Sequence, residues 1–118
     1  MTGPFADDER VVGEMIKNAG FKKDDSGKPK LSLLPAVGLE EIALVMQFGA
    51  EKYGRDNWKD GAEWTRYLDA ALRHLHSYSS GDDTDHESGQ THLAHAGCCI
   101  LFLLWYYHNG VGEDDRGS

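Results

Sequence analysis

The architecture of this chain follows from residues 66–104, which read RYLDAALRHLHSYSSGDDTDHESGQTHLAHAGCCILFLL. Apolar residues recur at helical spacing on both sides of a short segment, GDDTDHESG, which is too acidic and too rich in glycine to pack into a core. The pattern predicts two helices, over 66–79 and from about Ser88 to Leu104, joined by that loop. Five of the chain's six histidines lie in this stretch. We therefore expect the chemistry where the loop meets the two helices.

Outside this stretch the sequence predicts two further helices and several turns. A helix is expected from Pro35 to about Tyr53, because proline suits a first turn and the apolar residues follow a period of 3.6. A short helix is expected over 4–18, and the helix over 66–79 is expected to begin near Glu63 or Trp64. The chain is thus predicted to be a single all-α domain over 1–118, a small helical bundle of three main helices plus a short N-terminal helix. Residues 1–3 and 110–118 are expected to be disordered.

Composition limits the classes of function. The net charge of −8, from 12 basic and 20 acidic residues, disfavours nucleic acid as a partner, because a nucleic-acid groove needs a basic stripe. No segment reaches the ~20 apolar residues of a membrane span, and the first 13 residues lack the apolar run of a signal peptide. The two cysteines, Cys98 and Cys99, are adjacent and cannot form a structural disulfide on a helix. A cytoplasmic location, in the host cytoplasm if the chain is encoded by a phage, is the expectation.

The last predicted helix is apolar on almost every side from Ala96 to Tyr107. Such a helix must be covered on every side, and a domain of this size has few elements to do so. We therefore expect a homo-oligomer, a dimer or a tetramer, to complete the bundle. Small residues from Ala94 to Cys99 would let another helix come close.

Acids and histidines are concentrated within 27 residues, namely Asp69, His74, Asp82, Asp83, Asp85, His86, Glu87, His92 and His95. Carboxylates with one or two imidazoles suit Mg²⁺ or Mn²⁺, with Co²⁺ or Zn²⁺ as alternatives. Such an ion would let so acidic a protein accept a phosphorylated substrate and would activate a water for attack on phosphorus. The alternative needs no metal: Asp85 or Ser88 would cap the last helix and Glu87 would lie in its first turn.

The loop after the second helix combines cations, an amide and aromatic rings. Lys52, Tyr53, Arg55, Asn57 and Trp58 could stack a base and hold a phosphate. The same composition is typical of an amphipathic loop anchored by a tryptophan.

The charged segment around Lys30 and Ser32 likewise has one functional and one purely structural interpretation. Lys30 could serve a ligand, or the segment could be a solvated surface loop.

Three motifs together resemble the phage and bacterial family of dATP/dGTP diphosphohydrolases (N-terminal domain), which is similar to the MazG-like all-α nucleotide pyrophosphohydrolases. The motifs are KYGRDNW (52–58), ALRHL (71–75) and DHESGQTHLAHA (85–96), and the likeness covers about residues 28–107. The resemblance implies hydrolysis of a purine deoxynucleoside triphosphate to monophosphate and pyrophosphate, with a divalent metal and usually in an oligomer. MazG-like enzymes carry ExxE and ExxD on successive helices, whereas here the corresponding helices offer Asp69 and His74, then His92 and His95.

The site is therefore assigned by chemistry and location rather than by the MazG-like motif. The metal candidates are His74, Asp85, Glu87, His95 and Glu41; the catalytic candidates are Glu87, His92, Asp69 and Arg73; the substrate-binding candidates are Lys30, Lys52, Tyr53, Asn57 and Trp58. A rival hypothesis is a non-catalytic nucleotide-binding protein or a helical assembly or adaptor protein. The preferred base is left open.

Overall fold

The computed structural model describes residues 22–117, and the chain divides into two units, 1–31 and 32–118. In the first unit the described residues, 22–31, are exposed and contain a turn in which the amide of Lys28 donates to the carbonyl of Asp25. The helix predicted over 4–18 and the disorder predicted over 1–3 fall outside the described residues. Lys30 lies in this first unit and is exposed.

The second unit consists of helices, as predicted. Its elements are η1 (Leu31–Leu33, shared with the end of the first unit), α2 (Ala36–Tyr53), η2 (Asn57–Asp60), α3 (Trp64–Ser79) and α4 (His92–Asn109). Between residues 22 and 117 there is no strand, only two isolated bridges. The predicted all-α bundle is confirmed, and the bounds of α2 and α3 agree with the sequence pattern.

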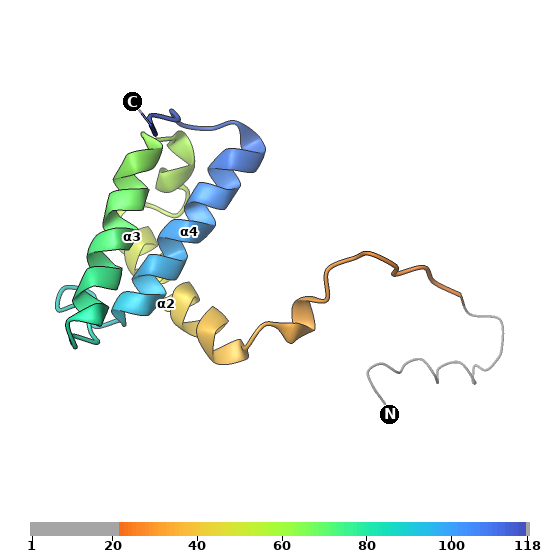
Figure 1. Ribbon diagram of the computed structural model, residues 1–118, viewed down its shortest axis with the longest axis horizontal. Coiled ribbons are helices and arrows are strands. Elements are labelled where there is room, and N and C mark those ends of the chain that lie inside the picture. Colours follow the sequence, from red (N-terminus) through yellow and green to blue (C-terminus); the bar gives the residue numbers. More distant parts are fainter. Residues whose placement is uncertain (1–21, 118) are drawn as a thin grey trace. The chain divides into compact units, whose positions relative to one another are not determined.

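Helix α4 packs against both other helices (Figure 1). Ala94, Ala96 and Cys98 are buried on it, and a β-carbon added to Gly97 would lie 2.8 Å from the Cδ1 atom of Ile42 in α2. The small residues of α4 thus let α2 approach closely, which is the role that the sequence suggested for them. No helix in the described part of the chain combines the length and the hydropathy that crossing a bilayer requires.

The start of α4 differs from the prediction. The helix begins at His92 rather than near Ser88, and Thr91 is its N-cap: the Thr91 hydroxyl accepts from the amide of Ala94 at 3.1 Å. Gly89 has a φ of +75°, and its amide donates to the carbonyl of Asp85, so the chain turns where a helix was expected. The alternative in which Asp85 or Ser88 caps α4 and Glu87 lies in its first turn is therefore wrong.

Helix α3 buries less of its apolar stripe than its sequence predicts. Leu68, Ala71, Leu72 and Leu75 follow the helical period and form that stripe. Only Ala71 is buried, whereas the three leucines are exposed. These leucines lie on the surface of the isolated chain.

The segment after α4 also differs from the prediction. Residues 110–117 were expected to be disordered, but they lie against the start of α3. The amide of Trp64 donates to the carbonyl of Glu113 at 2.9 Å, and the amide and hydroxyl of Thr65 donate to the two carboxylate oxygens of Asp115. The polar composition that suggested disorder instead supplies the hydrogen bonds that hold the segment.

Gly112 is the closest contact of this segment and gives a test of it. Its φ is +79°, and a β-carbon there would lie 2.4 Å from the carbonyl oxygen of Ala62. We expect Gly112→Ala to lower the free energy of unfolding by about 1–3 kcal/mol, measured by thermal denaturation. Gly117→Ala is the control, because Gly117 has a similar φ of +73° but no atom within 4 Å of the added carbon. Equal losses from the two variants would contradict the close packing.

Candidate functional site

A cavity of about 770 Å³ lies between α2 and α3, with α4 beneath it. Its walls come from the second half of α2, the loop that contains η2, three residues of α3, two residues of the loop before α4, and one face of α4. Eight of the predicted site residues line it: Lys52, Tyr53, Asn57, Trp58, His74, Asp85, Glu87 and His95.

One end of the cavity is aromatic. The ring of Trp58 stacks on that of Phe102 with their centroids 4.3 Å apart, and Tyr67 meets Phe102 edge-on at 5.1 Å. The hydroxyl of Tyr106, which is fully buried, donates to the carbonyl of Trp58. Trp58 therefore anchors its loop, which agrees with the interpretation of this segment as an amphipathic loop held by a tryptophan. It also lines the cavity. Its role in binding a base stays a prediction.

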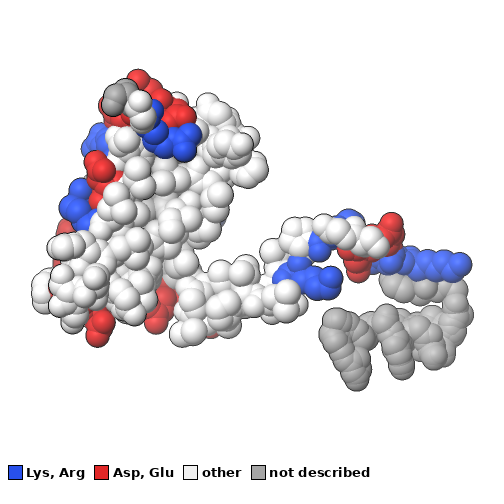
Figure 2. All heavy atoms as spheres, viewed as in Figure 1, with Lys and Arg blue, Asp and Glu red and all other residues white. Residues whose placement is uncertain are grey.

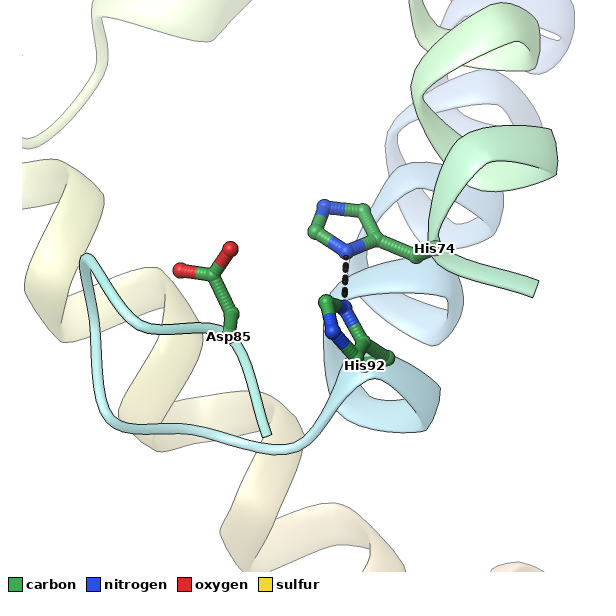
Figure 3. Close-up of side chains that lie close together, drawn as sticks. All are labelled: His74, Asp85 and His92. Atoms are coloured by element: carbon green, nitrogen blue, oxygen red, sulfur yellow. Dashed lines mark hydrogen bonds between the residues drawn. The ribbon is translucent and has the colours of Figure 1, made fainter. Parts of the chain in front are cut away.

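The other end of the cavity carries imidazoles and a carboxylate. His74 comes from α3, Asp85 from the loop and His92 is the first residue of α4, and the carboxylate of Asp85 lies across from the two imidazoles (Figure 3). One ligand atom from each of the three lies within 4.8 Å of the others. The Nδ1 atoms of His74 and His92 are 2.8 Å apart. This cluster has the donor atoms of a metal site.

His95 lies beside this cluster, one turn along α4 from His92. Its ring stacks on that of His74 with the centroids 4.5 Å apart, and its Nε2 atom is 2.6 Å from the hydroxyl of Ser88. The two histidines of α4 thus face the same neighbour, as their i, i+3 spacing predicts. His92 is buried beneath, and His95 is the one that lines the cavity.

The surroundings shift the pKa values of this cluster. Burial lowers the pKa of His74 below its ordinary value, and the charges of His95 and His92 lower it further. Burial lowers the pKa of His95 as well, against the opposing effect of Asp85. Burial raises the pKa of Asp85, but hydrogen bonds from Ser88 and the charges of His95 and His74 outweigh it and lower the pKa overall. Neutral imidazoles beside an ionised carboxylate are the forms that bind metal.

Lys52 and Glu87 form an ion pair at the exposed rim of the cavity. The hydrogen bond with Glu87 raises the pKa of Lys52 above its ordinary value. The Lys52 ammonium also lies 5.2 Å from the ring centroid of Tyr53. A cation therefore lies at the rim of the cavity.

The four remaining candidates of the second unit lie outside the cavity lining. Asp69 and Arg73 are exposed on α3, although the charge of Arg73 also lowers the pKa of His74. Glu41 accepts a hydrogen bond from the hydroxyl of Thr91 at 2.8 Å, so it ties α2 to the N-cap of α4. His92 lies below the cavity rather than on its wall.

Three site residues were not assigned from sequence. Asp82 lies 3.2 Å from the Nε2 atom of His92, Ser88 bonds to His95, and Phe102 forms the wall against Trp58. Asp82 was part of the acidic cluster, but no spacing rule distinguishes it from Asp83. Phe102 has the helical spacing of a core residue, and sequence alone does not separate a core residue from a cavity wall.

Cys98 and Cys99 also line the cavity. Burial raises the pKa of Cys98 to about 12 and that of Cys99 to about 11. Both are therefore neutral thiols near pH 7, and neither is suited to act as a nucleophile.

Comparison with known proteins assigns the chain to a family. The family described as "dATP/dGTP diphosphohydrolase, N-terminal" matches residues 17–116. This chain belongs to that family. The resemblance that the three motifs indicated is confirmed.

A relative within this group is a protein of Salmonella phage PMBT28 named dATP/dGTP diphosphohydrolase. It is 42% identical over 94 residues, which are 80% of this chain and 32% of that protein. The chain therefore spans about a third of the length of this relative. No solved structure matches the chain.

The shifted histidines give a test of the cluster in metal-free protein. At pH values well above 6.5, the ordinary pKa of histidine, both side chains are neutral whether the chain is folded or unfolded. As the pH falls below this value, the unfolded chain takes up protons that His74 and His95 in the folded chain bind less readily. The free energy of unfolding should therefore fall as the pH falls below 6.5, whereas the lowered pKa of Asp85 acts only below its ordinary value of 3.8.

The measurement is the melting temperature in chelator from about pH 7.5 to about pH 5.5. His74→Gln should weaken the pH dependence, and His76→Gln, on the exposed surface of α3, should leave it unchanged. The same dependence in both variants would contradict the assignment.

Proposed function

We propose that this chain contributes to the hydrolysis of a purine deoxynucleoside triphosphate, dATP or dGTP, to monophosphate and pyrophosphate in the cytoplasm, with a divalent metal ion. One observation carries the proposal: a single cavity joins an aromatic wall to a histidine and carboxylate cluster, with Lys52 at its rim. The name of the phage relative supports the substrate class.

The size and lining of the cavity suit a nucleotide. A volume of about 770 Å³ lies within the ~300–1,000 Å³ typical of small-molecule sites. Tyr53, Asn57 and Trp58 would contact the base or the sugar, and Lys52 would bind the phosphates in place of Glu87. Arg55 and Lys59 also line the cavity, so cations surround a substrate that the net charge of the protein would otherwise repel.

The cluster supplies the groups that hydrolysis requires. The nitrogen and oxygen donors of His74, Asp85 and His92 fit a divalent ion, which when bound would polarise the phosphate and lower the pKa of a water. His95, neutral near pH 7 and open to the cavity, would accept the proton of the attacking water. The water oxygen bonds to the α-phosphorus, the bond from that phosphorus to the bridging oxygen breaks, and pyrophosphate leaves with the electron pair. Lys52 would offset the charge on the leaving group.

We expect the protein to release pyrophosphate from dATP or dGTP when a divalent ion is supplied. Lys52→Met should lower kcat/KM by about tenfold or more, because a charged hydrogen bond to phosphate contributes about 1.5–3 kcal/mol. Lys28→Met, on the exposed segment of the first unit, is the control and should leave kcat/KM unchanged. Absence of product with each of Mg²⁺, Mn²⁺, Co²⁺ and Zn²⁺ would reject the proposal.

The rival hypothesis, a nucleotide-binding protein without catalysis, makes a different prediction. Its wild type would bind dGTP in calorimetry without turnover. Under the proposed function, His95→Ala should lose turnover at an unchanged melting temperature and should keep dGTP binding. Loss of folding in this variant would assign His95 a structural role instead.

We also propose that the chain acts as a homo-oligomer, a dimer or a tetramer. A second groove, lined on a different face of α3 and α4, contains Trp64, Leu68, Ile100, Leu103, Leu104, Tyr107 and Arg116. Leu104 and Tyr107 are 51% and 66% exposed. Figure 2 shows that this side of the helices carries few charged side chains, which lie mainly along its edge and on the C-terminal segment. A second copy of the chain, with the same apolar surface, is the occupant that self-association requires.

The oligomer is tested by Leu104→Lys, which places a charge in the groove. Light scattering coupled to size-exclusion chromatography should show the wild type as a dimer or tetramer and this variant shifted toward the monomer. Leu39→Lys is the control, because Leu39 is 47% exposed on α2 and does not line the groove. A monomeric wild type would contradict the expectation.

A further inference from the structure

We infer that His74, Asp85 and His92 form a centre that binds a first-row transition-metal ion, such as Co²⁺, Mn²⁺ or Zn²⁺, in preference to Mg²⁺. The inference deepens the proposed function and rests on it for the role of the ion in hydrolysis. The sequence led us to expect His74, Asp85, His95, Glu87 and Glu41 as metal ligands. In the inferred centre, His92 takes the place of His95, Glu87 and Glu41, and Mg²⁺ is no longer a preferred ion.

The spacing of the two imidazoles carries the first step. Two nitrogen ligands at about 2.1 Å from one ion, with an angle of about 90–110° between them, lie about 3.0–3.4 Å apart. The Nδ1 atoms of His74 and His92 are 2.8 Å apart, so a small outward movement of one ring would seat an ion between them. The two rings come from different helices, so the packing of α3 against α4 already brings the ligands together.

A carboxylate beside the Nε2 atom of His92 fixes the tautomer of this histidine. The Nε2 atom of His92 lies 3.2 Å from a carboxylate oxygen of Asp82, which favours the proton on that nitrogen. The lone pair of Nδ1 then points at His74. A carboxylate on the far nitrogen of a histidine is the usual outer partner of a metal ligand.

The third ligand is held independently. Asp85 accepts a hydrogen bond from the amide of Ser88 at 2.9 Å, which fixes its carboxylate in the loop. Figure 3 shows this carboxylate beside the imidazoles of His74 and His92, and one ligand atom of each residue lies within 4.8 Å of the others. Three ligands from three elements therefore converge without any change in the fold.

The different burial of the three ligands indicates that a bound ion would keep coordination positions open to the cavity. His92 is only 6% exposed and lies below the cavity, whereas His74 and Asp85 line its wall. An ion held by all three would face the cavity with its remaining positions. Three protein ligands with an open position are typical of catalytic rather than structural metal sites.

The donor atoms indicate which ion is preferred. Mg²⁺ favours oxygen ligands and keeps much of its water, whereas imidazole nitrogen suits Co²⁺, Zn²⁺ and, less strongly, Mn²⁺. Two of the three donors here are imidazole nitrogens. Carboxylates that would suit Mg²⁺ are engaged elsewhere: Glu41 with Thr91, and Glu87 with Lys52.

The test is a titration of chelator-treated full-length protein with CoCl₂, followed by the visible absorption of bound Co²⁺. We expect one ion per chain, with a spectrum typical of nitrogen and oxygen ligands, and no displacement by a hundredfold excess of Mg²⁺. His74→Ala and Asp85→Asn should abolish the signal. His76→Ala and His86→Ala, which change exposed histidines near the cluster, should leave it unchanged.

The outer carboxylate gives an independent readout. Asp82→Asn should weaken Co²⁺ binding by about 10–100-fold, because it removes the partner that sets the tautomer of His92. Circular dichroism of each variant establishes that it is folded. Because Asp85 lies on a loop, Asp85→Asn tests the site even if a histidine variant fails to fold.

The outcomes separate this inference from the proposed function. Displacement of Co²⁺ by an equal concentration of Mg²⁺, or Co²⁺ binding that is unchanged in folded His74→Ala and Asp85→Asn, would overturn the metal centre and leave hydrolysis to be judged by its own assay. Tight Co²⁺ binding without any release of pyrophosphate would support the centre and reject the proposed function.

Discussion

The close packing of helix α4 is the constraint on which the rest of this structure depends. It packs on both α3 and α2, and its small side chains determine how near the other helices come. At Gly97 the side chain of Ile42 occupies the space where a β-carbon would stand. The cavity lies above this floor, between two helices that are each positioned by the third. Any change in the small residues of α4 would therefore move the walls of the site as well as the core.

The ends of α4 give the cavity its two chemical halves. At its start, Thr91 caps the helix and bonds to Glu41, so that the entry of α4 is tied to α2 and His92 is held below the cavity. Farther along, Phe102 stacks against Trp58 and Tyr106 bonds to the backbone of the same tryptophan. One helix thus presents imidazoles at one end and aromatic rings at the other. A nucleotide, with phosphates at one end and a flat base at the other, has the matching division.

Sequence predicted the elements well and the junctions between them poorly. The helical periodicity of α2 and α3 is continuous, and Gly54 and Ser80 follow their last residues, so their bounds could be predicted. The start of α4 could not, because Ser88 and Asp85 have the same capping preference as Thr91. Thr91 differs from Ser88 and Asp85 in its hydrogen bond with Glu41, which lies fifty residues away in the sequence. The ordered segment after Asn109 was missed for the same reason, since its hydrogen bonds are with the start of α3.

The candidate site, too, could be predicted only as far as local patterns in the sequence reach. The three motifs contain the histidines and acids that line the cavity, namely His74, Asp85, Glu87 and His95, because these residue types are recognisable from their chemistry. The i, i+3 spacing predicted that His92 and His95 lie on one face of a helix, but it could not predict that they lie at different depths. Depth depends on how α3 and the loop cover that face, and this determines that His92 lies with His74 and Asp85 while His95 faces the cavity. Tertiary packing, which no local pattern encodes, separates the buried imidazole of His92 from the imidazole of His95 that lines the cavity.

The docking of residues 110–117 beside the start of α3 determines where the chain leaves the folded unit. Residues 110–117 lie at the end of the helices opposite the loop that carries Asp85 (Figure 1). At 1.5 Å per residue, His92 and the last turn of α4 are about 25 Å apart along the helix. A fluorescent label, an affinity tag or a surface linker attached beyond this point would therefore stand well away from the imidazole cluster. Attachment at that end would leave the exposed rim of the cavity, at Lys52 and Glu87, open to solution.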